Sequence, residues 1–428
     1  MNYYSLNNKN HSVSFQEAVI QGIAPDRGLY FPEKITPLPQ SFFEEIELLS
    51  KEEIAFQVIQ QFVGNEIPEA DLKQIIAETL CFDFPCVPIE DNVYALELYH
   101  GPTMAFKDVG ARFMSRCLGY FNRNSDKKVT VLVATSGDTG GAVASGFLGI
   151  KGVEVVILYP SGKVSDIQER QLTTLGQNIT ALEVAGVFDD CQDMVKKAFL
   201  DESLKHKNLT SANSINIARW LPQMFYFFFA YQQLKKYNQP LIVSCPSGNF
   251  GNICAGILAK RLGLPIAHFV AATNANDTVP LFMQSGTYLP KPSVATISNA
   301  MDVGNPSNFV RIQEMYHNDL NEFNKDFSSY TYTDEETRFA LKNIYTNSGY
   351  IAEPHGAVGY LGLKRELQNS SNSIGVFLET AHPIKFLDIV EPTLNIKLPI
   401  PTQIESVLGK EKISIKIKSY DELKAFLV

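Results

Sequence analysis

The sequence predicts an α/β fold with two lobes built on mostly parallel sheets and an extra amino-terminal unit. Beyond residue 90, short and nearly continuous apolar runs alternate with helical stretches, which is typical of parallel strands buried on both faces. Before that point, helical patterns occur without alternating strands. A chain of 428 residues is long enough for two or three packed domains, and we predict the divisions 1–90, 91–225 and 226–428.

The amino-terminal unit is predicted to be helical. Ser14 and Glu17 have the spacing of a capping box, which opens a helix that ends near Gly22. Two further amphipathic patterns follow at residues 52–62 and 70–80. We therefore expect this unit to precede the first strand of the α/β part.

Six apolar runs beyond this unit are predicted to be strands because they are rich in β-branched residues and bounded by turn residues. They cover residues 129–134, 153–159, 179–184, 241–245, 268–272 and 374–378. Helical patterns that include residues 220–231 are expected to connect the smaller lobe (91–225) to the larger lobe (226–428). Residues 412–418 alternate with period two and carry lysines on one face, which predicts a protected edge strand.

Composition and charge argue against several classes of protein. The chain is 45% hydrophobic and 19% charged, as an ordinary globular protein is. A formal net charge of −9, without basic runs, argues against a nucleic-acid partner. We find neither a membrane-spanning apolar run nor a signal peptide, so we expect a cytoplasmic protein that acts on a small molecule, as a monomer or small homo-oligomer. The six cysteines lack metal-binding spacing and the seven histidines are scattered, so we predict reduced cysteines and no metal.

Two glycine-rich turns each follow a predicted strand and precede a helix. Residues 135–140 read Thr-Ser-Gly-Asp-Thr-Gly, and residues 246–251 read Pro-Ser-Gly-Asn-Phe-Gly. Such turns point free backbone N–H groups at one place, which suits an anion. The second turn has neither the P-loop lysine nor the dinucleotide spacing, so a phosphate outside a nucleotide fits better. Taken alone, both turns are also compatible with close helix packing or with a nucleotide-binding α/β protein.

Lys107 and Thr380 are further candidate site residues, and both are chosen from the sequence around them. Lys107 lies on a predicted helix capped by Thr103 and shares a helix face with Gly110 and Ala111. A lysine amine on a partly buried face loses solvation, which makes it nucleophilic toward an aldehyde. The alternative is a lysine that pairs with a carboxylate or reaches solvent. Thr380 follows the last predicted strand and has a hydroxyl for hydrogen bonding to a ring nitrogen.

Taken together, the motifs resemble the threonine synthase family, in the same order and over nearly the whole chain. They are the segments 100–108, 134–140, 211–216, 246–251 and 380–383, with shorter similar segments at 3–5, 27–32, 274–280 and 298–302. The resemblance implies a tryptophan-synthase-β-like fold and a pyridoxal-phosphate-dependent lyase. Its reaction would convert O-phospho-L-homoserine and water to L-threonine and phosphate, the last step of threonine biosynthesis.

The resemblance also implies roles for individual residues. Lys107 would carry pyridoxal 5′-phosphate, and Thr380 would face its pyridine nitrogen. The cofactor phosphate would be held by Gly248, Asn249, Phe250 and Gly251. The substrate would be received by the turn that contains Thr135, Ser136, Asp138 and Thr139. Relatives often carry asparagine where this chain has Asp138, so the role of Asp138 is left open.

The leaving phosphate needs a cationic site of its own. Arg219 is our candidate, and Lys163 and Arg112 are the alternatives. Two other functions stay open from the sequence: another lyase or synthase of the same superfamily, and a non-catalytic relative that binds a phosphorylated metabolite.

Overall fold

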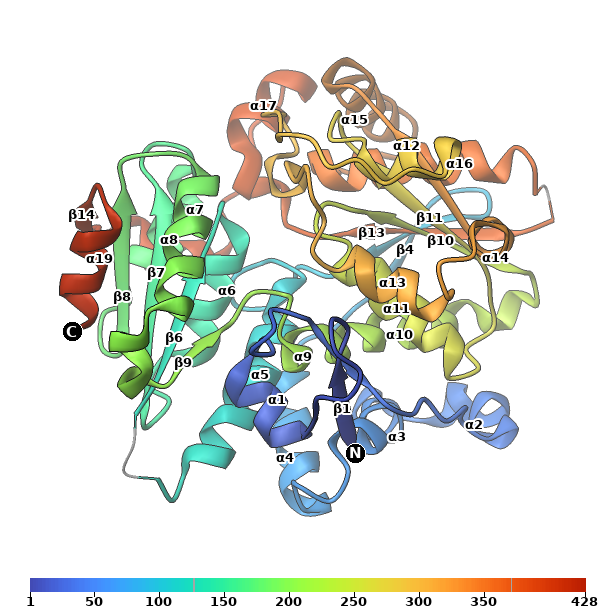
Figure 1. Cartoon of the computed structure of the whole chain (residues 1–428). Helices are drawn as coiled ribbons and strands as arrows, with labels where there is room; N and C mark the ends of the chain where they lie inside the picture. Colours follow the sequence, from blue (N-terminus) through green and yellow to red (C-terminus); the bar gives the residue numbers. More distant parts are fainter. Residues whose placement is uncertain (126–127, 371) are drawn as a thin grey trace.

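The computed structural model describes residues 1–125, 128–370 and 372–428, and Figure 1 shows how they are arranged. Three sheets organise the chain: one of three strands near the amino terminus, one of five strands and one of six. In Figure 1 the five-stranded lobe lies on the left, the six-stranded lobe on the upper right, and the amino-terminal stretch below them.

The amino-terminal stretch contains a small antiparallel sheet as well as the predicted helices. The strands, in the order β2-β1-β3, are β1 (Asn2–Ser5), β2 (Ser12–Ser14) and β3 (Tyr30–Pro32). The helices are α1 (Phe15–Gln21), α2 (Gln40–Glu45), α3 (Lys51–Val63) and α4 (Glu69–Thr79). The capping box of Ser14 and Glu17 is confirmed. The sheet was missed because strands of three or four residues are too short to show alternation.

The smaller lobe is a parallel sheet with the strand order β14-β8-β7-β6-β9. Its strands are β6 (Val129–Ala134), β7 (Val153–Pro160), β8 (Ile179–Val184), β9 (Leu209–Ser211) and β14 (Ile415–Ile417). Its helices are α5 (Lys107–Asn122), α6 (Asp138–Phe147), α7 (Asp166–Thr173), α8 (Phe188–Leu200) and α19 (Tyr420–Leu427). The three strands predicted here are confirmed, and β14 is the predicted edge strand.

The larger lobe has the strand order β12-β11-β10-β13-β5-β4, and every neighbouring pair is parallel except β4 with β5. Its strands are β4 (Cys86–Glu90), β5 (Val93–Glu97), β10 (Leu241–Pro246), β11 (Ile266–Thr273), β12 (Phe327–Thr331) and β13 (Ile374–Glu379). The main helices on or near it are α10 (Met224–Leu234), α11 (Gly251–Arg261), α15 (Asp334–Ser348) and α16 (Pro354–Leu367). The shorter ones are α9 (Ile217–Trp220), α12 (Thr278–Ser285), α13 (Phe309–Met315), α14 (Leu320–Asp326), α17 (Leu387–Leu394) and α18 (Thr402–Leu408).

Two strands pair in a sheet whose other strands come mostly from a different predicted domain. β5 falls in segment 91–225, yet it pairs with β13 in the larger sheet. β14 falls in segment 226–428, yet it pairs with β8 in the smaller sheet. The place of a strand in the sequence therefore does not decide which sheet it joins, because strand pairing is non-local and leaves no mark on local hydrophobicity. The three-part division itself stays a prediction.

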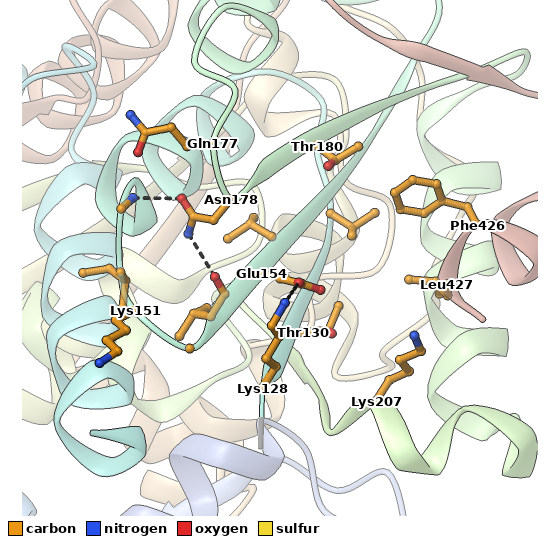
Figure 2. Close-up of a pocket in the computed structure, with 16 residues that line it drawn as sticks. Lys128, Thr130, Lys151, Glu154, Gln177, Asn178, Thr180, Lys207, Phe426 and Leu427 are labelled. Carbon is orange, nitrogen blue, oxygen red and sulfur yellow. Dashed lines mark hydrogen bonds and ion pairs between the residues drawn. The ribbon is translucent and has the colours of Figure 1, made fainter. Parts of the chain in front are cut away.

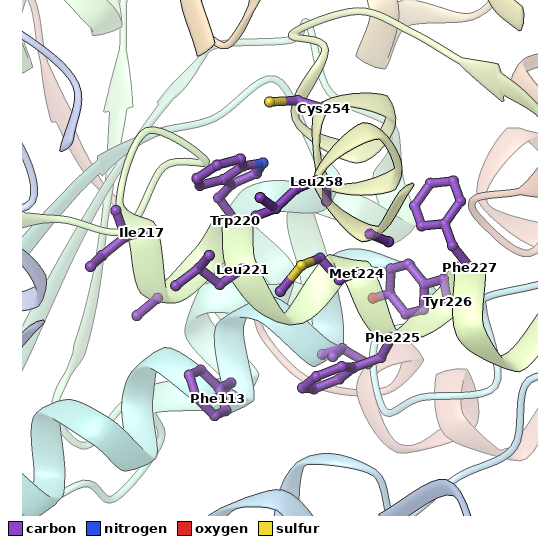
Figure 3. Close-up of a cluster of buried hydrophobic side chains, with 14 of the residues drawn as sticks. Phe113, Ile217, Trp220, Leu221, Met224, Phe225, Tyr226, Phe227, Cys254 and Leu258 are labelled. Atoms are coloured by element: carbon purple, nitrogen blue, oxygen red, sulfur yellow. The ribbon is translucent and has the colours of Figure 1, made fainter. Parts of the chain in front are cut away.

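One hydrophobic core connects all three parts of the chain. Figure 3 shows side chains that α5, α9, α10 and α11 contribute to it, with Trp220 near its centre. The Phe31 ring of β3 lies 5.9 Å from the Trp220 ring, centroid to centroid. The Tyr3 hydroxyl of β1 donates to the Phe62 carbonyl at 2.6 Å. The amino-terminal stretch is therefore packed into the body of the molecule.

Among the described residues, no helix is both long and apolar enough to cross a membrane. Within the same ranges, no three His, Cys, Asp or Glu side chains gather as a metal ion would require. All six cysteines are unpaired.

Candidate active site

Backbone pairing places Lys107 beside Thr380, although 272 positions separate them in the sequence. Ala105 forms an isolated antiparallel bridge with Ala381. The Phe106 N–H donates to the Thr380 carbonyl at 2.8 Å. Because Lys107 follows this bridge directly and begins α5, the two predicted site residues lie at one place, where the carboxyl end of β13 meets the start of α5.

The turn before α5 differs from the prediction that Thr103 caps the helix. The helix begins at Lys107, and Met104 lies in the left-handed region with φ 53°. The Thr103 hydroxyl donates to the Asp108 carboxylate at 2.5 Å, and the Thr103 N–H donates to the other oxygen at 2.9 Å. The reason for the error is that Asp108, one residue inside the helix, reaches back and fixes the turn. The Asp108 carboxylate is thus engaged by Thr103, and it forms no ion pair with the neighbouring Lys107.

Lys107 is a partly buried lysine whose amine has no bonded partner among the described residues. No hydrogen bond or ion pair joins its Nζ to any of them, and the Nζ lies 5.4 Å from the centre of the Phe106 ring. Burial lowers the pKa of Lys107, the Asp138 carboxylate acts in the opposite direction, and the cations of Lys385 and Arg219 lower it further. An amine in this setting is available as the neutral nucleophile. Of the two alternatives read from the sequence, pairing with a carboxylate does not occur in the described residues.

The turn at 135–140 is closed by its own threonine. The Thr135 hydroxyl accepts the N–H groups of Gly137 at 3.0 Å and Gly140 at 2.8 Å. The Ser136 and Thr139 side chains are partly exposed and form no hydrogen bond within the described residues. The turn therefore offers two free hydroxyls at the amino-terminal end of α6, whereas Thr135 is occupied in holding the turn together.

Asp138 is a buried carboxylate paired with a buried lysine. Its Oδ1 lies 2.6 Å from Lys385 Nζ and accepts a hydrogen bond from Gln168 at 3.1 Å. Burial alone raises the pKa of Asp138, but Lys385 and Lys107 overcome this effect and bring it to about 2. Lys385 also donates to the Thr103 carbonyl at 2.8 Å. Asp138 is therefore an anion fixed by Lys385, close enough to Lys107 to affect its charge.

The turn at 246–251 leaves four consecutive backbone N–H groups open. Those of residues 248–251 have no acceptor within the described part of the chain, and they precede or begin α11. A Cβ on Gly248 would lie 2.6 Å from the Met301 Cα, so only glycine fits there. Phe250 has φ 60°, a left-handed conformation that is unusual for an aromatic residue and often marks a functional turn. Four free donors at the start of a helix suit a phosphate dianion.

The Asn249 side chain is held by hydrogen bonds to two neighbouring residues. Its amide donates to the Ser214 hydroxyl at 2.9 Å, and its amide oxygen accepts the Ser307 N–H at 2.6 Å. Asn249 thus holds the turn in shape, and its own contribution to an anion site comes through its backbone N–H.

Thr380 is buried at the end of β13 and is hydrogen-bonded to a carboxylate. Its hydroxyl donates to Glu353 Oε1 at 3.1 Å. Glu353 is fully buried and caps the amino terminus of α16. The sequence reading missed both Glu353 and Lys385. The only local signals for them were the helix start Glu-Pro-His and a lysine within the apolar segment that follows β13.

The three candidate cations for a leaving phosphate lie in different surroundings. Arg219 is 2% exposed, donates to the Ala212 carbonyl at 2.5 Å, and has no hydrogen-bond partner for its Nε. Burial lowers the pKa of Arg219 to about 10. Arg112 donates to the Glu78 carbonyl, and Lys163 is exposed. Of the three, only Arg219 affects the pKa of Lys107 strongly enough to count among its main causes.

A separate cavity of about 600 Å³ lies at the end of the smaller sheet where its parallel strands begin, away from the glycine turn that follows β6. Figure 2 shows it at the beginnings of β6, β7 and β8, beside Phe426 of α19. Lys128 and Glu154 line it and pair with each other at 2.6 Å. Both glycine turns and Thr380 follow the carboxyl ends of strands, where ligands of parallel sheets bind. This cavity is therefore not part of the candidate active site.

Comparison with known proteins shows which family the chain matches. Residues 72–378 match the family described as "Pyridoxal-phosphate dependent enzyme", residues 2–80 match "Threonine synthase N terminus", and residues 356–427 match "Threonine synthase, C-terminal". A threonine synthase of Haemophilus influenzae is 44% identical over the full length of both chains. The crystal structure of Escherichia coli threonine synthase superposes with a TM-score of 0.94 at 42% identity, covering 100% of this chain and 99% of that one. A structure of Brucella melitensis threonine synthase, described as bound to pyridoxal phosphate, also gives 0.94, at 32% identity, and covers 100% of this chain and 98% of that one.

Proposed function

The chain belongs to the threonine synthase family of pyridoxal-phosphate-dependent enzymes, and on that premise we propose which of its residues convert O-phospho-L-homoserine and water to L-threonine and phosphate. Lys107 holds the cofactor. The observation that carries this proposal is the partly buried Lys107 amine, which has a lowered pKa, has no bonded partner among the described residues and lies beside Thr380.

The site residues fit pyridoxal phosphate at three points. The free N–H groups of residues 248–251 would hold the phosphate, the Lys107 amine would hold the aldehyde carbon, and the Thr380 hydroxyl would hold the ring nitrogen. When bound, the cofactor would supply an electron sink for the carbon atoms next to the substrate nitrogen. The residues that would hold it come from both lobes, because the phosphate turn and Thr380 follow strands of the larger sheet and the turn with Asp138 follows a strand of the smaller one.

Lys107 is also the group that moves protons. With the cofactor bound, the Lys107 amine would accept the proton from the substrate α carbon and exchange protons at the β and γ carbons as phosphate leaves. Its lowered pKa favours the neutral amine that accepting the first proton requires. The Asp138 and Lys385 pair beside it adds no net charge, so it orients the site without fixing a proton on Lys107.

The substrate carboxylate binds at the 135–140 turn. The free hydroxyls of Ser136 and Thr139 donate to it, the start of α6 favours its charge, and Thr135 keeps the turn closed. Asp138 takes no part in this contact, because Lys385 and Gln168 hold its side chain.

Arg219 binds the phosphate that leaves the substrate. Its Nε has no partner among the described residues, and its charge is close enough to lower the pKa of Lys107. An Arg219→Ala enzyme is expected to bind O-phospho-L-homoserine much more weakly, and normal substrate affinity would exclude this role. The alternatives, Lys163 and Arg112, serve as controls in the same assay.

The test of the function is an absorbance spectrum of the purified protein and of Lys107→Ala, before and after O-phospho-L-homoserine is added. Threonine and phosphate are assayed in parallel. We expect the parent protein to show the absorbance band of lysine-bound cofactor and to form both products in equal amounts, whereas Lys107→Ala shows neither. A coloured protein that is inactive on this substrate would indicate another lyase or synthase of the superfamily. A colourless protein that cannot be reconstituted would leave only a phosphorylated-metabolite-binding relative.

Two properties follow as proposals from a biosynthetic role. We expect the enzyme in the cytoplasm, and we expect a monomer or a small homo-oligomer, which light scattering on the purified protein would measure.

A further inference from the structure

Gly110 is a glycine inside the helix that begins with Lys107. Because glycine weakens a helix relative to alanine, its place in α5 needs a reason in the packing. Gly110 is buried, and a Cβ at this position would lie 2.7 Å from the Arg219 carbonyl oxygen and 3.1 Å from Arg219 Nε. The carbonyl belongs to the backbone, so it cannot turn aside as the end of a side chain can. The missing Cβ therefore allows α9 to lie directly against α5 (Figure 3).

The guanidinium of Arg219 is held at this contact with free N–H groups. Its Nη1 donates to the Ala212 carbonyl, and neither its Nε nor its Nη2 has a hydrogen-bond partner among the described residues. No carboxylate of the same residues forms an ion pair with it. The Arg219 carbonyl accepts the side-chain N–H of Gln223 at 2.9 Å, which fixes the backbone. A buried guanidinium with free donors and no carboxylate partner suits an anionic ligand.

A second contact ties the segment that carries Arg219 to the start of α5. The Tyr226 hydroxyl of α10 donates to the Phe106 carbonyl, directly before Lys107. Residues 217–234 form an unbroken run of helical turns from α9 to α10. Moving α9 away from Gly110 would therefore disturb the Tyr226 contact, so the spacing between Lys107 and Arg219 is set at two points.

Lys107 and Arg219 mark the two ends of the substrate in the proposed function, on which this inference rests. Lys107 would act at the α carbon, and Arg219 would bind the phosphate. Residues 107 and 110 lie about one turn apart on α5, so the contact at Gly110 sets the distance between these two ends. We infer that Gly110 is a specificity-determining residue, which selects the number of atoms between the α carbon and the phosphorus atom of the substrate. Gly110 acts through Arg219 and is a positioning residue.

The test measures how unreactive phosphonates bind to protein loaded with pyridoxal phosphate, from the absorbance change of the lysine-bound cofactor. A methylene replaces the bridging oxygen in these amino acids, so phosphate cannot leave. 2-Amino-5-phosphonopentanoate has the chain length of O-phospho-L-homoserine, whereas 2-amino-4-phosphonobutanoate is one atom shorter and 2-amino-6-phosphonohexanoate is one atom longer. We expect the parent protein to bind the matched length about tenfold more tightly than either of the others. Equal affinity for the three lengths would overturn the inference.

Gly110→Ala should push α9 away from α5 and shift the preference toward the longer ligand. We expect the affinity for the longer phosphonate, relative to the matched one, to rise by about tenfold. Gly146→Ala is the matched control, because a Cβ at Gly146 would lie 3.0 Å from the carbonyl carbon of Ala111 and would crowd α5 against α6 instead of α9. It should keep the parent's ratio of affinities. An unchanged ratio in Gly110→Ala, or the same shift in Gly146→Ala, would overturn the inference.

A second variant decides the question if Gly110→Ala does not fold. Tyr226→Phe keeps the ring but removes the hydroxyl that holds α10 to the Phe106 carbonyl. The spacing then loses one of its two supports, so the preference for the matched length over the longer one should weaken. A preference as strong as the parent's would count against Gly110 as the residue that selects length.

Failure of the proposed function has a different signature. If Arg219 does not bind the phosphate, Arg219→Ala would lose no affinity for the phosphonates relative to L-2-aminopentanoate, which carries no phosphonate. If Lys107 does not hold the cofactor, the absorbance band never forms. If Arg219→Ala loses the phosphonates but Gly110→Ala keeps the parent's length preference, the function stands and this inference alone is wrong.

Discussion

The two glycine turns have similar sequences but differ in how their own residues engage the backbone N–H groups. In the 135–140 turn, the Thr135 hydroxyl accepts two N–H groups, so the turn is bonded to itself. In the 246–251 turn, the N–H groups of residues 248–251 have no acceptor among the described residues, and Asn249 is anchored outward to Ser214 and Ser307. The same signature gives one turn that is closed and one that is open to an anion.

Charge separates the two turns as well. Asp138 puts a carboxylate at the first residue of α6, and Lys385 is needed to neutralise it. The 246–251 turn contains no charged side chain. A phosphate dianion therefore suits the second turn, whereas the first suits a carboxylate bound by hydroxyls. A strand, a glycine turn and a helix are not enough to assign a ligand, and the internal hydrogen bonds decide it.

The largest expected effect comes from removing the counter-ion that the first turn needs. Lys385→Met leaves Asp138 buried and unpaired, which should lower the free energy of unfolding by about 3–5 kcal/mol in urea titrations at neutral pH. Lys163→Met, at an exposed lysine, is the control and should change it by less than about 0.5 kcal/mol. Equal stability of the two variants would show that the pair is not needed.

The same pair predicts a pH dependence. The pKa of Asp138 lies at about 2 in the folded chain, below its ordinary value of 3.8, so its stabilisation is fully present above pH 3.8 and is lost as the pH falls through about 2. The stability difference between the parent and Lys385→Met should therefore shrink as the pH is lowered from neutral. A difference that stays constant down to the acid limit of folding would contradict this.

The open turn should be sensitive to a single added carbon atom. Gly248→Ala places a Cβ 2.6 Å from the Met301 Cα, which should cost about 1–3 kcal/mol of stability and weaken cofactor binding. Gly409→Ala is the matched control, since no atom lies within 4 Å of its added Cβ. Fluorescence titration with pyridoxal phosphate measures the affinity, and unaltered affinity in Gly248→Ala would argue against a phosphate at this turn.

Two substitutions in the 135–140 turn should have different effects, one on stability and the other on substrate binding. Thr135→Val leaves the Gly137 N–H without its acceptor and removes one of the two acceptors of the Gly140 N–H, which should lower stability by about 1–3 kcal/mol. Ser136→Ala should change stability by less than about 0.5 kcal/mol but raise the KM for O-phospho-L-homoserine. Urea titration and steady-state kinetics on both variants measure the two effects. If Ser136→Ala lowered stability and Thr135→Val only raised the KM, Ser136 would be the residue that holds the turn and Thr135 the one that binds the substrate.

The sequence predicted the six longer strands and the three longer amino-terminal helices because each of them carries a strong local pattern of hydrophobicity. It did not predict the strands of three to five residues, apart from β14, because so short a run shows too little alternation. It also gave no partner for β5 or β14, because pairing between distant segments has no local signal. The backbone bridge between Ala105 and Ala381, which forms the centre of the site, is a contact of the same non-local kind.

The candidate site residues were predicted through motifs, and what the structure adds is their partners. Lys107 and Thr380 were named from the sequence, but Lys385 and Glu353 were not. Both missed residues act through a charge that is buried by tertiary packing. A lysine in an apolar segment and a glutamate before a proline have ordinary local explanations, so burial and distance are needed to recognise them.

The exchange of strands between the two lobes has a consequence for how the molecule is made. A fragment of residues 226–428 would have the central strands of the larger sheet without β5, and a β14 with no β8 to pair with. Because β14 follows every strand of the larger sheet in the sequence, the smaller sheet is complete only after the larger one has been synthesised. The two lobes are therefore expected to fold together, and neither half of the chain holds all the strands of its own sheet.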